Sequence, residues 1–312
     1  MTGGEYMDDK FEELFGHPVS IDKWFPYNSY LNKDRTSLQR DNLFSTGLLN
    51  INDSNDIKFV PTTLLTSYNK DIMEIHHEIK IEDTEVVLEN EIFYTSRIEG
   101  ANTTLIRTRE LKEGSSINKD NRNSELMVLN GFKAVKYLNL VGNSLSKKSL
   151  LEVWNILVTE CCENESIRGP EYRVGDVHVG THIGLDSNMI DYYMNNFIEF
   201  YNSNKYDEVP FIKAILLHYM FETIHPFCDG NGRLGRLLIN NYLISRGYEC
   251  CRAVSFSKLI CERRGAYDAA FYDSENIYND CTPFLEFMLR LFDDSLHLAI
   301  EAQNLQETDL FK

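Results

Sequence analysis

The clearest hydrophobic pattern predicts two helices joined by a tight loop. Pro210 suits the first position of a helix, and residues 211–224 are apolar on nearly every face, which is typical of a helix buried in a core. Pro226 ends this helix, because proline cannot continue the hydrogen-bond ladder and displaces the residue before it. Leucines at helical spacing follow the loop, and Gly247 suits the end of the second helix.

Weaker patterns predict further elements. Residues 85–99 have helical spacing that closes at Gly100, a glycine suited to a helix end. Residues 172–183 alternate over a short stretch and predict a β-hairpin. Residues 284–302 have the spacing of an amphipathic helix, whereas 112–125, rich in small and charged residues, predict a solvated connection.

The loop between the two strongest helices contains residues suited to binding phosphate. Gly230 and Gly232 permit backbone conformations closed to other residues, so that successive N–H groups turn inward as an anion-binding nest at the start of a helix. The helix dipole adds to the attraction for phosphate. Asp229 at the rim offers a hard oxygen to Mg²⁺, which usually binds one or two carboxylates together with substrate phosphates.

Charged side chains of the same stretch complete a candidate active site. Arg233 and Arg236 lie three residues apart, on one helix face, and can neutralise phosphate charge. His225 can take a proton near neutral pH. A plain turn is the alternative for the Asp-Gly-Asn-Gly run alone, and an EF-hand is excluded because its alternating ligands and final Glu are missing. Together these residue types favour a nucleotide-handling site.

This string, HPFCDGNGRLGR from His225 to Arg236, resembles the signature of the Fic family, HxFx(D/E)GNGRxxR, at every defined position. The resemblance implies a mainly α-helical fold, with a Fic-type helical core and a short β-hairpin flap. It also implies a nucleotidyltransferase that moves AMP from Mg-ATP to a Ser, Thr or Tyr hydroxyl of a target protein and releases pyrophosphate.

The resemblance assigns roles to individual residues. His225 resembles the base that deprotonates the target hydroxyl, and Asp229 resembles the magnesium ligand. The residues expected to bind the nucleotide and its phosphates are Phe227, Gly230, Asn231, Gly232, Arg233 and Arg236.

A second stretch, from Thr95 to Gly100, matches the inhibitory motif of the family, (S/T)xxxE(G/N). In Fic proteins that have it before the signature, its Glu pairs with the last Arg of the signature and blocks the productive position of the ATP γ-phosphate. The match predicts an ion pair between Glu99 and Arg236. Thr95 and Glu99 are four residues apart and so share one helix face. A capped surface helix ending in an ordinary Glu is the alternative.

The predicted hairpin matches the place of the flap that holds the target segment in Fic proteins by main-chain pairing. Val177, His178 and Val179 are its expected docking residues. This chain lacks the Tyr-x-Pro-Pro-like stretch that often follows the flap in Fic proteins, and this departure weakens the prediction of how a target docks. We expect His178 and His182 to be exposed strand residues, because their spacing with nearby Asp is irregular for a metal site.

Composition limits the classes of partner that this protein is expected to bind. A net charge of −17 on 312 residues argues against binding to nucleic acid or to an anionic membrane. No apolar run is long enough to span a bilayer and the start lacks a signal segment, so a cytoplasmic location is expected. The seven cysteines form neither a disulfide framework nor a zinc pattern. ATP must therefore be bound by local arginines and Mg²⁺.

The expected organisation is an N-terminal region, 1–124, with the inhibitory helix at about 85–100, then a Fic catalytic core, 125–283, and a C-terminal helix, 284–312. Other functions stay open. Glu99 could position water to remove AMP, or another phosphate-containing group such as UMP or phosphocholine could be transferred. A non-catalytic ATP-binding regulator is disfavoured by the intact His225 and Asp229. Self-modification and a homodimer are also open.

Overall fold

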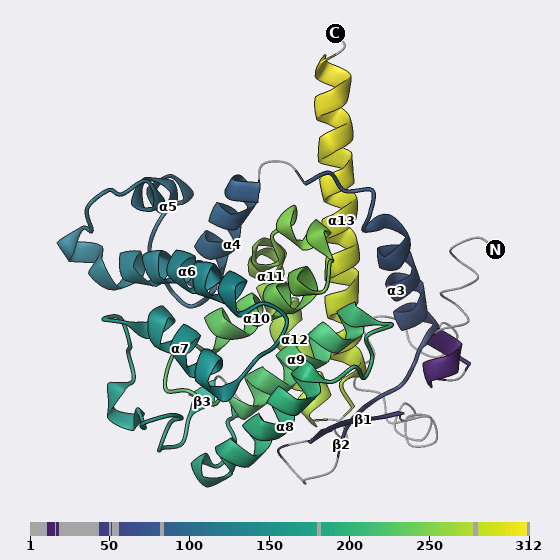
Figure 1. Cartoon of the computed structure of the whole chain (residues 1–312), viewed down its shortest axis with the longest axis horizontal. Coiled ribbons are helices and arrows are strands. Elements are labelled where there is room, and N and C mark those ends of the chain that lie inside the picture. Colours follow the sequence, from purple (N-terminus) through teal and green to yellow (C-terminus); the bar gives the residue numbers. More distant parts are fainter. Residues whose placement is uncertain are drawn as a thin grey trace. The chain divides into compact units, whose positions relative to one another are not determined.

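The computed structural model describes residues 11–15, 17–18, 44–49, 51, 56–81, 84–179, 182–276 and 280–310. Within these residues the structure is mainly helical, with two small antiparallel sheets of two strands each (Figure 1). The mainly α fold with a short hairpin is therefore confirmed. None of the helices in this part of the chain combines the length and apolarity needed to cross a membrane.

The chain forms two compact units, each assembled from segments that are distant in sequence. The first comprises Met1–Lys80, Asn204–Tyr219 and Arg263–Lys312, and the second comprises Ile81–Ser203 and Met220–Glu262. The units thus interleave along the chain, whereas the three expected regions follow chain order. That linear division stays a prediction.

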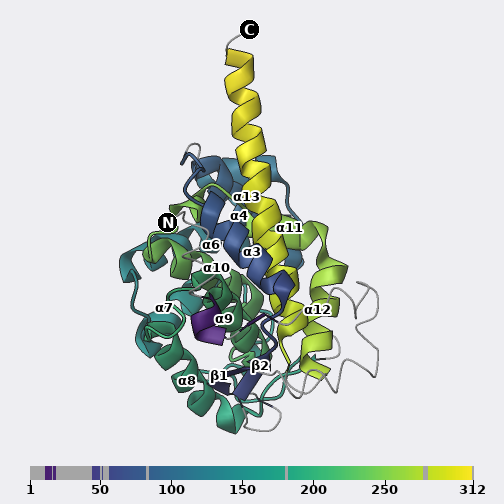
Figure 2. The same ribbon diagram turned by 90° about the vertical axis from the view of Figure 1, so that its right-hand side faces the viewer.

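The first unit contains α13 (Thr282–Leu310), which lies beside α3 (Thr63–Ile75) (Figure 2). Thr62 joins them: its hydroxyl accepts from the Leu65 N–H at the start of α3 and donates to Glu286 of α13 at 2.7 Å. α13 extends beyond the expected 284–302 at both ends.

The same unit contains a hairpin that the sequence pattern does not predict, β1 (Phe44–Leu49) paired antiparallel with β2 (Asp56–Phe59). Helix α12 (Arg264–Asn276) packs against α13. The N-terminal stretch of mixed polarity therefore contributes strands, in addition to α3, to this unit.

The second unit is helical around α10 (Asn231–Ser245), whose residues are nearly all buried and which contacts several neighbouring helices. Among those neighbours are α4 (Thr84–Ile98), α6 (Arg122–Val141) and α7 (Lys147–Val158). The unit also holds α5 (Leu105–Lys112), α8 (Ile190–Asn202) and α11 (Phe256–Glu262). Helix α9 (Pro210–Ile224) continues from the first unit into the second.

The hairpin of the second unit is short, as predicted. β3 (His178–Val179) pairs antiparallel with β4 (His182–Ile183), and residues 180 and 181 between them lie outside the described part of the chain. Gly184 extends the ladder by donating its N–H to the Val177 carbonyl at 3.0 Å.

The expectation of a solvated connection over 112–125 is wrong at its end. Glu125 is 2% exposed and accepts from Arg107 Nε at 2.8 Å, and Arg107 belongs to α5, a helix that the hydrophobic pattern does not reveal. Five of the eight residues of α5 are polar, and its three apolar residues do not recur at helical spacing, so the periodicity that marks other helices is missing. Its basic residues bind carboxylates of α4 and α6 instead, and Thr104 caps its first turn.

Candidate active site

The loop from His225 to Gly230 joins the end of α9 to the start of α10, and Asn231 closes it. The Asn231 side chain accepts from the Phe227 N–H at 2.9 Å and donates to the Phe227 carbonyl at 2.8 Å. His225 adopts φ +49°, a left-handed conformation that is unusual for a residue other than glycine and is found mainly where surrounding contacts enforce it. The loop therefore has a fixed shape.

Arg173 supports the base of this loop. Its guanidinium donates to the His225 carbonyl at 2.8 Å and to the Ile224 carbonyl at 3.4 Å, and its own N–H donates to the Pro226 carbonyl at 3.0 Å. The same side chain, 2% exposed, also donates to the carbonyls of Gly175, at 2.5 Å, and of Leu185. A cation is favourable here because the carbonyls at the end of α9 lack helical partners. Sequence reasoning missed Arg173, which belongs to no motif.

His225, at the start of the loop, has a pKa shifted by its surroundings. Burial, with smaller contributions from the nearby His182 and Arg173, lowers the pKa of His225 to about 4, although the Glu99 carboxylate acts in the opposite direction. A hydrogen bond to the Glu222 backbone also acts to raise this pKa, but burial prevails. The imidazole is therefore neutral at pH 7 and can accept a proton.

His182 is buried, which corrects the expectation that both hairpin histidines are exposed. It is 6% exposed, its Nε2 lies 3.0 Å from the Thr223 carbonyl, and its ring centroid is 6.5 Å from that of His225. Side chains alternate along a strand, so with Ile183 outside, at 61% exposed, His182 points inward. His178 is exposed, as expected.

The N-terminus of α10 forms the predicted nest. Gly230 adopts φ +79°, and the first intrahelical hydrogen bond runs from the Leu234 N–H to the Gly230 carbonyl, so the N–H groups before Leu234 have no helical partner. A Cβ at Gly232 would lie 2.3 Å from Glu99 Oε1 and 3.0 Å from Arg236 Nη1. Only glycine leaves room there for a carboxylate against the helix.

Asp229 lies at the rim of the nest with its carboxylate held from several sides. Oδ1 accepts from the Gly230 N–H at 2.5 Å and from Arg233 Nη2 at 3.2 Å, and Oδ2 accepts from the Glu163 N–H at 3.1 Å. The side chain remains 19% exposed, whereas that of Arg233 is 1% exposed and also donates to the Leu157 carbonyl. One hard, partly exposed carboxylate beside a phosphate nest fits a Mg²⁺ ion whose other ligands are phosphates and water.

Phe227, predicted to contact the nucleotide, lies beneath the loop. Its side chain is fully buried and stacks on Trp154, with centroids 4.4 Å apart and planes 8° apart. Trp154 in turn donates from Nε1 to the Asp229 carbonyl at 2.9 Å. The structure thus gives Phe227 a supporting position, and it adds Trp154, which the sequence marks only as one of two tryptophans.

The end of α4 brings Thr95 and Glu99 to Arg236. Arg236, which is 5% exposed, donates from Nε to Thr95 Oγ1 at 2.8 Å and from Nη2 to Glu99 Oε1 at 2.5 Å. Glu99 follows the last residue of α4, and Gly100 with φ +89° ends the helix. The structure therefore contains the ion pair expected from the sequence.

Glu91, one further carboxylate of α4, was missed by sequence reasoning. It is 4% exposed and accepts from Ser255 Oγ at 2.9 Å, from the Ser257 N–H at 3.0 Å and from Ser257 Oγ. Burial raises its pKa, against the effect of the serine hydrogen bonds and of Arg236. Its spacing of four residues to Thr95, repeated from Thr95 to Glu99, is the signal that could have placed it on the same helix face.

Comparison with known families supports this description. The family model for the Fic/DOC family matches residues 144–243, which include the hairpin and the loop from His225 but not α4. A protein adenylyltransferase Fic from Aedes aegypti is 26% identical over 330 residues, covering 95% of this chain and 62% of that protein. One from Culex quinquefasciatus is 30% identical over 224 residues, covering 68% and 41%. The chain spans less than two thirds of the length of these relatives.

Solved structures have the same fold. A Fic family protein from Desulfovibrio desulfuricans G20 aligns with a TM-score of 0.68 and 22% identity, covering 78% of this chain and 76% of that one. Fic-1 from C. elegans aligns with a TM-score of 0.62 and 21% identity, covering 78% and 72%. At this identity the likeness establishes a Fic-type helical fold.

Proposed function

This chain belongs to the Fic/DOC family, and we propose that it is a protein adenylyltransferase, which moves AMP from ATP to a hydroxyl of a target protein. The observation that carries the proposal is the neutral imidazole of His225 beside a glycine-lined helix N-terminus with Asp229 at its rim. The names of the matched relatives agree with it. A base has no purpose in a protein that only binds ATP, so the geometry favours an enzyme.

In the proposed reaction, His225 takes the proton of a Ser, Thr or Tyr hydroxyl on the target. The hydroxyl oxygen forms a bond to the α-phosphorus of ATP, while the bond from that phosphorus to the bridging oxygen breaks and pyrophosphate leaves. The protein mainly positions this in-line attack and stabilises the spreading charge. General-base assistance of this kind contributes about 10²- to 10⁴-fold.

The phosphates are proposed to bind at the start of α10. The N–H groups after Gly230 and the Arg236 guanidinium supply the positive charge, while Arg233 holds the Asp229 carboxylate in place. Asp229 would be the protein ligand of Mg²⁺, which when bound neutralises phosphate charge. Phe227 and Asn231 hold the loop that presents these groups.

Glu99 is proposed to inhibit this site. Its carboxylate lies over Gly232 and pairs with Arg236, and therefore occupies the position that a terminal phosphate would need. A carboxylate and a phosphate compete for the same cation and the same dipole. Activity then requires Glu99 to move away.

The hairpin is proposed to hold the target segment by strand pairing. β3 and β4 are only two residues long, and both His178 and Ile183 are exposed, so an incoming strand could extend this small sheet. Main-chain pairing of this kind tolerates many target sequences. Val177 and Val179 are proposed to bind the target in the same way, through their main chain.

Removal of AMP is the second candidate. The Glu99 carboxylate, 30% exposed, lies against the nest, where it could orient a water molecule toward a modified side chain. The cytoplasmic location, self-modification and a homodimer remain predictions.

The test is the intact mass of the protein after incubation with Mg-ATP, for wild type, Glu99→Gly and the Glu99→Gly, His225→Ala double variant. We expect an adenylyl adduct, on the chain or on an added target, that is strongest in the single variant and lost in the double one. UTP and CDP-choline serve as alternative donors. An adduct that persists without His225 would overturn the assignment of the base, and AMP release from a modified target only when Glu99 is present would favour the removal reaction.

A further inference from the structure

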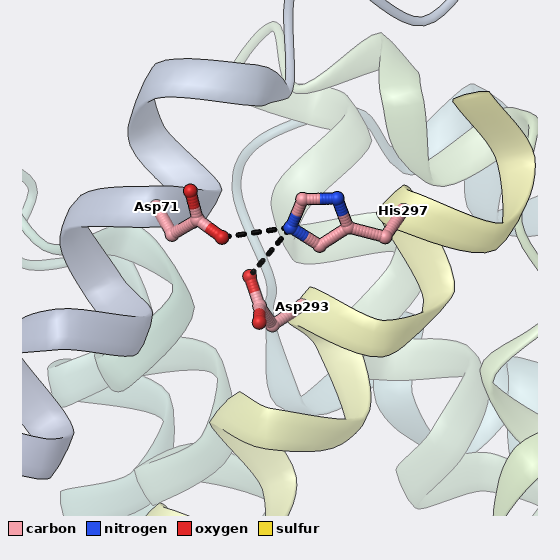
Figure 3. A group of neighbouring side chains, drawn as sticks. All are labelled: Asp71, Asp293 and His297. Carbon is pink, nitrogen blue, oxygen red and sulfur yellow. Dashed lines mark hydrogen bonds and ion pairs between the residues drawn. The ribbon is translucent and has the colours of Figure 1, made fainter. Parts of the chain in front are cut away.

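We propose that Asp71, Asp293 and His297, in the first unit, form a binding site for a divalent transition-metal ion (Figure 3). Asp71 comes from α3, and the other two come from α13, where they are four residues apart and so share one helix face. Nothing in the adenylyl-transfer proposal uses these residues, so the inference is independent of it.

The three donor atoms already lie close together. His297 Nε2 is 2.8 Å from Asp71 Oδ2 and 3.8 Å from Asp293 Oδ1, and one ligand atom of each residue lies within 4.8 Å of the others. Around a tetrahedral ion with bonds of about 2.0 to 2.2 Å, neighbouring ligand atoms are about 3.4 Å apart. Small side-chain rotations therefore suffice to bring the three onto one ion.

The buried carboxylate of Asp293 is the second observation that points to a cation. Asp293 is 9% exposed, and its Oδ1, which Figure 3 joins to His297 by an ion pair, makes no hydrogen bond in the described part of the chain. A buried carboxylate oxygen normally has a hydrogen-bond partner or a bound cation. His297 Nε2 hydrogen-bonds to Asp71 at 2.8 Å, whereas its ion pair with Asp293 Oδ1, at 3.8 Å, is too long to be a hydrogen bond.

The two helices are held in register on both sides of this cluster. Toward one end Thr62 Oγ1 donates to Glu286 at 2.7 Å, and toward the other Gln303 exchanges two hydrogen bonds with the backbone of Lys80, in the segment that follows α3, at 3.1 and 2.7 Å. The ligands are thus preorganised, and a bound ion would join α3 to α13.

The chemistry of the ligands selects the class of ion. One imidazole and two carboxylates suit Zn²⁺, Co²⁺ or Ni²⁺ better than Mg²⁺ or Ca²⁺, which prefer oxygen ligands only. The side chains of His297 and Asp71 are 50% and 41% exposed, so water can complete the coordination. Glu301, one turn beyond His297, adds negative charge nearby.

The test uses Co²⁺ as the probe, titrated into the full chain with excess Mg²⁺ and followed by visible absorption and by the shift in melting temperature. A site of nitrogen and oxygen ligands gives weak visible bands, whereas binding to cysteine thiolates adds strong near-ultraviolet bands, so the two are told apart. We expect one equivalent to bind with visible bands alone and to raise the melting temperature.

His297→Gln and Asp293→Asn should each weaken Co²⁺ binding at least about tenfold, because even residues that only support a metal ligand contribute that much. Asp294→Asn is the matched control: its carboxylate lies next along α13 but pairs with Arg263, so binding should be unchanged. Asp71→Asn provides a second test if a buried substitution unfolds the chain. The absence of visible bands in wild type, or their survival in all of these variants, would overturn the site.

Discussion

Glu91 lies within α4, and Glu99, eight residues further on, directly follows its last residue. The two carboxylates accept hydrogen bonds from different kinds of donor. Glu91 is 4% exposed and accepts only from neutral donors, those of Ser255 and Ser257. The Glu99 side chain is 30% exposed and accepts from the charged Arg236. A phosphate bound at the start of α10, as proposed, would compete with Glu99 for Arg236 but would not compete for the serine donors. One carboxylate therefore fixes the helix, and the other can be displaced.

Releasing Glu99 should have the largest effect. We expect Glu99→Gly to raise the initial rate of adenylyl transfer by about 10- to 100-fold, since a hydrogen bond between charged groups is worth about 1.5 to 3 kcal/mol and each 1.4 kcal/mol is a factor of about ten. The measurement is adduct formation at saturating Mg-ATP. Glu85→Ala, an exposed carboxylate of the same helix, is the control and should leave the rate unchanged. Equal rates for wild type and Glu99→Gly would contradict inhibition by Glu99.

Adding a methyl group at Gly232 tests whether the phosphates bind at the position that Glu99 occupies. The new Cβ would lie 2.3 Å from Glu99 Oε1, so Gly232→Ala should break the ion pair while filling the nest itself. We therefore expect Gly232→Ala in the Glu99→Gly background to lower the rate by about tenfold or more, as small displacements at a reacting centre do. A rate equal to that of Glu99→Gly alone would show that the phosphates do not bind over Gly232.

Removing the buried carboxylate of α4 should mainly reduce stability. Glu91→Ala leaves the N–H of Ser257 and two hydroxyls without their acceptor, which costs about 1 to 3 kcal/mol for a buried polar group. Urea unfolding followed by circular dichroism measures this change. Because the helix loosens without losing Glu99, activity should rise by less than it does for Glu99→Gly. If Glu91→Ala raised activity as much as Glu99→Gly does, the two carboxylates would not have the different roles described here.

The smallest expected effect is that of pH. Because the pKa of His225 is lowered to about 4, the base is already unprotonated at higher pH, and protonation removes it only as pH falls toward that value. In the Glu99→Gly variant kcat/KM should therefore be nearly constant from about pH 5.5 to 8 with respect to this group. Glu99 acts to raise this pKa, so its removal keeps the value low. A loss of half the activity near pH 6.5 would indicate an unperturbed histidine.

The parts of this molecule that the sequence predicts well depend on local rules. The helices flanking His225 follow from apolar spacing and from Pro226, and the meeting of Thr95, Glu99 and Arg236 follows from a four-residue spacing and the family motif.

The parts that it does not predict depend on contacts between distant residues. Arg173 donates hydrogen bonds to carbonyls about fifty residues further along the chain, and no local sequence pattern identifies it. His182 is buried only because Thr223 and the end of α9 lie against its strand. Helix α5 has charge pairing in place of an apolar face, so periodicity could not reveal it.

The position of Arg173 has a kinetic consequence. One guanidinium holds the carbonyls of Gly175 and Leu185, on either side of the hairpin, and also the carbonyl of the residue proposed to accept the proton. The hairpin proposed to bind the target and the proposed base are therefore held by the same side chain. Changes in the hairpin should alter kcat as well as KM, and a poorly fitting target should be rejected at the chemical step even after it has bound.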